Sequence, residues 1–139
     1  MLSGANITLD LTQVSNVGHL DPELNSRLSG IEVVDLGAAS NKLKLTAKDV
    51  LDLSDAVDLT MVSINYSDFR QLVVQGPANS TLDLADGTGT TGWSQLNNAA
   101  NNAFATVTGA NWGDASHNYS AWMNYNHVIM YVQSGVVVI

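Results

Sequence analysis

The sequence contains no cysteine. This absence excludes a disulfide scaffold and any zinc site that uses cysteine ligands. Charged residues are also scarce, since they make up 13% of the chain, against about 25% in typical soluble domains. Basic residues are the rarest charges, because five lysines and arginines stand against 13 aspartates and glutamates. The net charge of −8 argues against nucleic acid as a partner, since phosphate binding needs clustered basic side chains.

Long hydrophobic runs and catalytic motifs are missing as well. No run of about 18 apolar residues occurs, so we expect no membrane insertion. The chain has no P-loop, no H-E-x-x-H motif and no nucleophile elbow, so we do not expect an enzyme. Apolar residues nevertheless make up 45% of the sequence. This content favours one folded domain over residues 1–139, which we interpret as cut from a longer chain.

Apolar and polar residues alternate with a period of two along much of the chain, as in half-buried strands. Gly, Pro, Asn and Ser separate these segments and favour turns between them. The pattern predicts about nine short strands, at residues 7–11, 31–36, 41–45, 57–64, 70–76, 80–84, 105–109, 127–133 and 135–139. Such a series predicts a mainly β fold, either β-sandwich-like or an irregular β-rich domain.

Two stretches depart from this period. The stretch LTAKDVLDLSD predicts a short helix near 46–54. Its Thr46 is a good N-cap, and Asp49 follows three residues later as in a capping box. In this helix the apolar side chains would be buried and Asp52 would face solvent. The stretch WSQLNNAANNAF, at 93–104, allows a second helix, although asparagine lowers its helix propensity.

Seven motifs follow one another along the chain: IEVVDLG at 31–37, SNKLKL at 40–45, DVLDLSD at 49–55, LVVQG at 72–76, TLDL at 81–84, GW at 92–93 and YNHVIMYVQSGVVVI at 125–139. In this order they resemble a domain of very large bacterial adhesins of the repeats-in-toxin type, which are exported by type I secretion. The resemblance covers roughly residues 29–139. Segments 56–69 and 94–124 depart from it, because they are longer than in the family.

The resemblance implies an extracellular location on the bacterial cell surface and a non-catalytic role near the ligand-binding end of an adhesin. It implies neighbouring domains of the parent adhesin as partners and calcium as the bound metal. A surface glycan or peptide is the expected ligand class. The resemblance does not name the ligand.

Calcium binds about six to eight oxygen ligands, many of them from carboxylates. Two pairs of aspartates are candidate ligands. Asp83 and Asp86 flank the turn in LDLADGTGT, where the alternative is a plain Asp-Gly turn without metal. Asp55 and Asp58 follow the predicted helix, where the helix dipole disfavours negative charge unless a cation or a lysine offsets it. Capping and solvation explain the earlier aspartates of that helix without metal.

Aromatic residues are concentrated near the end of the sequence, since all three tryptophans lie after residue 92. The segment NWGDASHNYSAWMNYNH, at 111–127, mixes aromatic rings with short polar side chains. Such a mixture is typical of surfaces that contact sugars or peptides. The candidate ligand-binding residues are Trp112, Asp114, Tyr119 and Trp122. A carbohydrate-binding β-sandwich is therefore the alternative function, and a third interpretation is that these rings only close the core.

Overall fold

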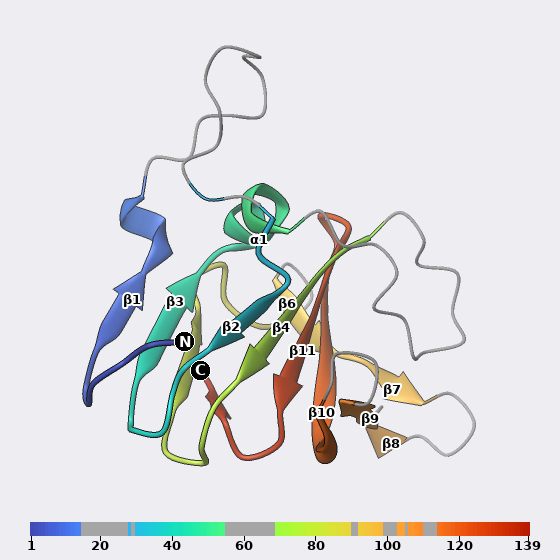
Figure 1. Ribbon diagram of the computed structural model, residues 1–139. Coiled ribbons are helices and arrows are strands. Elements are labelled where there is room, and N and C mark those ends of the chain that lie inside the picture. Colours follow the sequence, from blue (N-terminus) through green and yellow to red (C-terminus); the bar gives the residue numbers. More distant parts are fainter. Residues whose placement is uncertain are drawn as a thin grey trace.

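In its described residues the chain forms a mainly β fold with one α-helix (Figure 1). The computed structural model describes residues 1–14, 28, 30–54, 69–89, 92–98, 103–104, 106–109 and 114–139. Its elements are β1 (Thr8–Asp10), η1 (Leu11–Gln13), β2 (Val33–Asp35), β3 (Lys42–Leu45), α1 (Ala47–Leu53), β4 (Arg70–Gln75), β5 (Thr81–Leu84), β6 (Trp93–Gln95), β7 (Asn97–Asn98), β8 (Ala103–Phe104), β9 (Thr106–Gly109), β10 (Asp114–Asn124), β11 (Val128–Gln133) and β12 (Val137–Val138). The mainly β prediction is confirmed.

The strands form two main sheets. The first sheet has the order β1-β3-β5-β12, and every neighbouring pair in it is parallel. The second sheet has the order β2-β4-β11-β10-β6, and β9 also pairs with β10. In this second sheet β2, β4 and β11 are parallel, whereas β10 runs antiparallel to β11, β6 and β9. The short strands β7 and β8 form a separate antiparallel pair.

Three strand–turn–strand units connect the two sheets. They are β2–β3, β4–β5 and β11–β12, with turns at 36–41, 76–80 and 134–136. Each unit starts in the second sheet and ends in the first, and the units stack in parallel register. This stacking is an internal structural repeat that the sequence pattern did not predict. The three turns differ in length, and the segments between the units are unequal, so no fixed period appears in the sequence.

Asn41 joins the first turn to the N-terminal segment. Its side chain is 1% exposed and makes three hydrogen bonds. The Oδ1 atom accepts from the backbone N–H of Ile7 at 2.8 Å, and the Nδ2 atom donates to the carbonyls of Gly4 at 3.0 Å and Leu36 at 2.7 Å. A buried amide that satisfies three backbone groups from these two segments holds them in one arrangement. The position of β1 beside β3 follows from these bonds.

Two hydrophobic clusters lie on opposite faces of the second sheet. The larger cluster fills the space between the sheets, and its residues include Leu43, Leu45, Leu72, Val74, Leu82, Leu84, Met130 and Val132. The smaller cluster lies on the other face and consists of Val73, Tyr119, Ala121, Ile129 and Tyr131. Successive residues of a strand point to opposite faces, so β4, β10 and β11 each contribute to both clusters. Both faces of this sheet are therefore buried around these strands.

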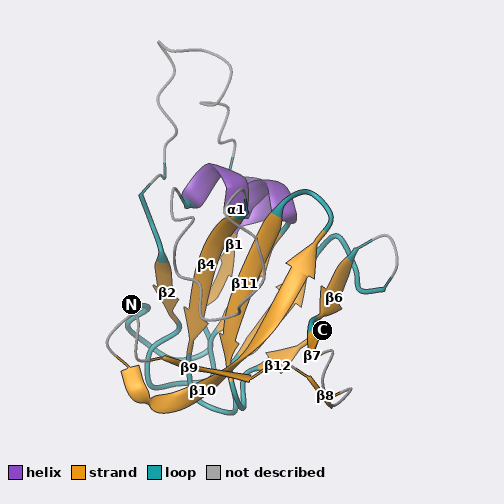
Figure 2. Ribbon diagram, turned by 90° about the vertical axis from the view of Figure 1, so that its right-hand side faces the viewer, coloured by secondary structure: helices purple, strands orange, loops and turns teal. Residues whose placement is uncertain are grey.

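Helix α1 lies across one end of the strands and contacts β3, β4 and β11 (Figures 1 and 2). The prediction of a helix near 46–54 is confirmed, and its capping box is present. The Thr46 side chain accepts from the Asp49 N–H at 3.2 Å, and Asp49 accepts from the Thr46 N–H at 2.6 Å. The prediction that Asp52 faces solvent is wrong. Asp52 is 9% exposed, and it forms an ion pair with Lys48 at 2.6 Å.

The prediction of a second helix at 93–104 is also wrong, because the described residues of this stretch form β6, β7 and β8. Pairing with a distant strand favours strand over helix in this stretch. Trp93 of β6 lies opposite Asn124 of β10, and its side chain is fully buried in the larger cluster. Such burial and pairing override a weak local helix propensity. The strand expected at 57–64 lies outside the described residues.

Candidate functional site

The first candidate metal ligand, Asp83, lies on the outer face of the first sheet. Its neighbours Leu82 and Leu84 on β5 point into the core, so the alternation of the strand directs Asp83 outward. One carboxylate oxygen of Asp83 is 2.7 Å from the ammonium group of Lys42 on β3. The side chain of Lys42 is 35% exposed, and that of Asp83 is 23% exposed. The described partner of this carboxylate is therefore a lysine.

The second candidate metal ligand, Asp86, contacts the start of α1. Its Oδ2 atom accepts a hydrogen bond from the backbone N–H of Ala47 at 2.5 Å. This N–H is one of the first four in the helix, which have no partner within the helix itself. A carboxylate at this end also interacts favourably with the helix dipole. Asp86 thus acts as a second cap beside Thr46, although it lies 39 residues from Ala47 in the sequence.

Glycines shape the turn that carries Asp86. Gly87 adopts a φ of 76°, in the left-handed region that favours glycine. A Cβ atom on Gly92 would lie 2.2 Å from the carbonyl oxygen of Gly87. The backbone at Gly87 and at Gly92 therefore approaches too closely for any side chain at position 92. The backbone N–H of Trp93 donates to this same carbonyl at 2.9 Å. The Gly87 carbonyl is thereby bonded to the protein backbone.

The other pair of candidate metal ligands, Asp55 and Asp58, lies outside the described residues. Within the ranges that the structure describes, no group of three or more histidine, aspartate or glutamate side chains is placed to hold a metal ion. Calcium binding at Asp83, Asp86, Asp55 or Asp58 stays a prediction. The described geometry assigns an ion pair to the first of these residues and a helix cap to the second.

Tyr119 was expected on a ligand-contact surface, and this prediction is wrong. The side chain is fully buried in the smaller cluster. Its hydroxyl oxygen accepts a hydrogen bond from Nε2 of Gln75 at 2.9 Å. The alternation of β10 decides this placement, because Tyr119, Ala121 and Met123 share the face that packs against Tyr131 and Ile129 of β11.

Trp122 lies on the opposite face of β10, at the margin of the larger cluster. It is half-buried, and its Nε1 atom donates to Oγ of Ser120 at 3.0 Å. Of the remaining ligand-binding candidates, Trp112 lies outside the described residues. Asp114 is the first residue of β10, where the backbone pairs with Gly109 of β9. The structure therefore does not bring the four candidates together into one described surface.

The hairpin between β10 and β11 carries an aromatic group that the sequence pattern did not single out. Tyr125 is 67% exposed at the tip of this hairpin. His127 follows with a φ of 62°, which is uncommon for a residue other than glycine. The His127 ring stacks on Phe69 with ring centroids 4.9 Å apart and an interplanar angle of 26°. The backbone N–H of Arg70 also donates to the His127 carbonyl at 2.9 Å, so the tip is tied to the start of β4.

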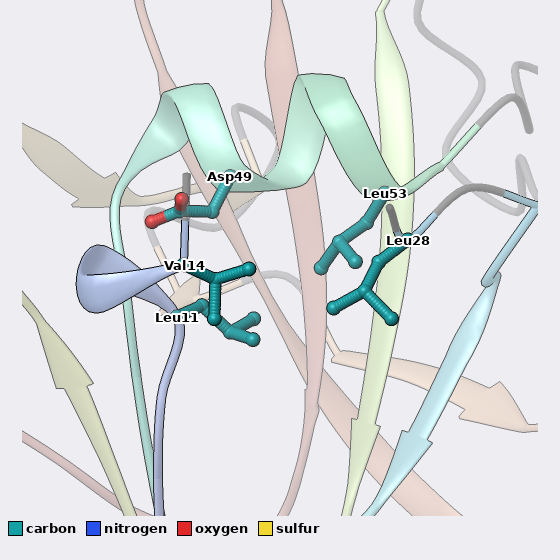
Figure 3. A pocket seen from close by; sticks show the side chains of 5 residues that line it. All are labelled: Leu11, Val14, Leu28, Asp49 and Leu53. Carbon is teal, nitrogen blue, oxygen red and sulfur yellow. The ribbon is translucent and has the colours of Figure 1, made fainter. Parts of the chain in front are cut away.

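A small hollow beside α1 is shown in Figure 3, where Leu11, Val14, Leu28, Asp49 and Leu53 line it. Its cavity volume is about 10 Å³, roughly the space that one water molecule needs. Pockets that hold drug-sized ligands are larger, roughly 300–1,000 Å³. Among the described lining residues Asp49 is the charged one, and its carboxylate already serves the capping box. The described residues of this hollow therefore do not form a ligand site.

No family model, curated protein or solved structure matches the chain. In the described part of the chain, no helix is long and apolar enough to cross a membrane. A function for this protein must therefore be inferred from its motifs and from the geometry of its described residues.

Proposed function

We propose that this chain is a non-catalytic module of a large bacterial surface adhesin of the repeats-in-toxin type. The module lies outside the cell, calcium stabilises it, and neighbouring domains of the parent adhesin contact it. It scaffolds the ligand-binding end of the adhesin or contributes to it. The ordered series of seven sequence motifs carries this proposal.

The described fold supports the proposal because the motifs correspond to neighbouring structural elements. IEVVDLG covers β2 and the start of the first turn, SNKLKL covers the end of that turn and β3, and α1 follows directly after β3 and the cap Thr46. LVVQG and TLDL are the two halves of the next strand–turn–strand unit, and they pair with the first unit in parallel register. A series of weak motifs that together build one packed unit is stronger support than any one motif alone.

Calcium dependence is tested by thermal unfolding of the 139-residue protein in EDTA, in 10 mM CaCl₂ and in 10 mM MgCl₂. A ligand present at about 100 times its Kd adds roughly 2.7 kcal/mol to the free energy of unfolding. For a domain of this size we expect a rise in Tm of about 5–10 °C in calcium and a smaller rise in magnesium. Equal Tm values in EDTA and calcium would contradict calcium stabilisation of this module.

The exposed Tyr125, two residues before the His127 that stacks on Phe69, favours carbohydrate binding as a second candidate function. Aromatic rings offer a large contact area at low cost in conformational entropy, and this suits the apolar faces of sugar rings. A glycan array probed with the wild-type protein and with Tyr125→Ala tests this candidate. Binding that the substitution abolishes would support it. Silence across the array, or binding that the substitution leaves unchanged, would count against it.

A further inference from the structure

The strand β12 forms the last strand of the first sheet in the described part of the chain. Its backbone bonds to β5 alternate along the strand. The N–H groups of Val137 and Ile139 donate to the Ser80 and Leu82 carbonyls, each at 2.9 Å. In a β ladder the residue between two such positions directs its N–H and C=O to the opposite side. The backbone groups of Val138 therefore face the open edge of the sheet.

The second sheet extends further on this same side. Its strand β11 leads into β12 through the turn at 134–136, and beyond β11 this sheet continues with β10 and β6. In the described residues, the first sheet has no strand beyond β12. Trp122 lies on the inner face of β10 and is only half-buried, whereas Met130, its partner on β11, is fully buried. Trp122 therefore marks a partly uncovered place on this inner face, although Trp93 on the next strand, β6, is fully buried.

These two features describe an edge with a hydrophobic neighbour. The open backbone groups of Val138 can bond one more strand, and Trp122 offers apolar surface on the core side of such a strand. On the outer side Val137 is 49% exposed and Ile139 is 56% exposed. A strand added here would bury apolar surface on both of its faces. Exposed apolar edge strands of this kind are templates for a further strand.

We propose that the β12 edge is a strand-addition site for an extended peptide with apolar residues between basic flanks. The overhang of β10 and β6 favours a single extended segment, because a folded partner would meet these strands before its own edge reached β12. One strand occupies only about 4.8 Å beside its neighbour. The net charge of −8 attracts a basic peptide over longer range. This site is independent of the adhesin proposal and of calcium.

A direct test titrates the wild-type protein into a fluorescein-labelled peptide, Lys-Val-Thr-Val-Thr-Val-Lys, and follows fluorescence anisotropy. Two variants distinguish backbone pairing from nonspecific hydrophobic binding. Val138→Pro removes the N–H that faces the open edge, and proline is tolerated at such positions because that N–H makes no bond within the sheet. Val138→Thr changes the side chain at nearly constant shape and keeps the N–H. We expect Val138→Pro to weaken binding at least about tenfold and Val138→Thr to change it less than about threefold.

Two versions of the peptide, N-methylated either at all valines or at both threonines, keep the test valid if Val138→Pro fails to fold. An added strand bonds to β12 along one side only, so we expect one of the two methylated peptides to lose binding and the other to keep it. Equal binding by the wild type and Val138→Pro would overturn the proposal. Equal affinity of both methylated peptides, or no anisotropy change up to about 1 mM protein, well above the range of specific peptide binding, would overturn it too.

Discussion

Substitution of Asp86 by alanine separates helix capping from calcium binding at this residue. In the structure Asp86 accepts a hydrogen bond from the first N–H of α1 at 2.5 Å. Alanine removes this acceptor and the negative charge near the positive end of the helix dipole. The helix keeps its own capping box between Thr46 and Asp49, so α1 should still form. The loss is therefore confined to one tertiary contact.

The size of the loss follows from comparable helix caps. Replacing a capping side chain by alanine costs about 0.5–2 kcal/mol, and the charged acceptor favours the upper half of this range. We expect a loss of about 1–1.5 kcal/mol, which lowers Tm by roughly 3–7 °C in a domain of this size. Asp86→Asn keeps an acceptor oxygen, so it should lose less. Asp83→Ala removes an exposed ion pair with Lys42 and should cost at most about 1 kcal/mol.

The assay is thermal unfolding of the wild type and the three variants, each in EDTA and in 10 mM CaCl₂. If Asp86 is only a helix cap, Asp86→Ala lowers Tm by the same amount in both solutions. If Asp86 binds calcium, the variant loses the rise in Tm that calcium gives the wild type. An Asp86→Ala protein with wild-type Tm in EDTA would refute the capping role inferred from the Ala47 contact.

Two further predictions concern Tyr131 and His127. Burial raises the pKa of Tyr131 from 10.0 to about 12. As the pH rises, the unfolded chain therefore loses the proton of this hydroxyl before the folded protein does. The free energy of unfolding should be unaffected below about pH 10 and should fall between pH 10 and 12. Tyr131→Phe should reduce this fall in stability, whereas Tyr125→Phe, at an exposed position, should not. Chemical denaturation of both variants at pH 9 and pH 11.5 measures the free energy of unfolding. His127 has a φ of 62°, in the left-handed region, which a β-branched residue fits poorly. His127→Val should therefore destabilise the protein by about 1–2 kcal/mol more than His127→Asn. Urea denaturation compares the two variants, which both lose the ring stack on Phe69. Equal denaturation midpoints would contradict the role of the left-handed backbone at this position.

Much of the fold could be predicted where short-range patterns decide it. Alternation of apolar and polar residues located β3, β5 and β11 to within about a residue at each end, because a half-buried strand requires this period. The capping box of α1 was equally predictable, since Thr46 and Asp49 meet through the geometry of one helical turn. The candidate site was less predictable. The acidic turn predicts Asp86 as a calcium ligand, yet its described partner is a distant backbone N–H.

Local patterns in the chain were enough to predict the class of fold, the positions of most described strands and the capped helix, because these depend on residues close together in the chain. Packing between distant segments set the parallel stacking of the three strand–turn–strand units, which pairs Val33 with Val73 and Leu43 with Leu82. It also placed Tyr119 inside and Trp122 at the margin of the core, since alternation along β10 fixes opposite faces but not what covers them. The open edge at β12 likewise exists only because the two sheets end at different strands.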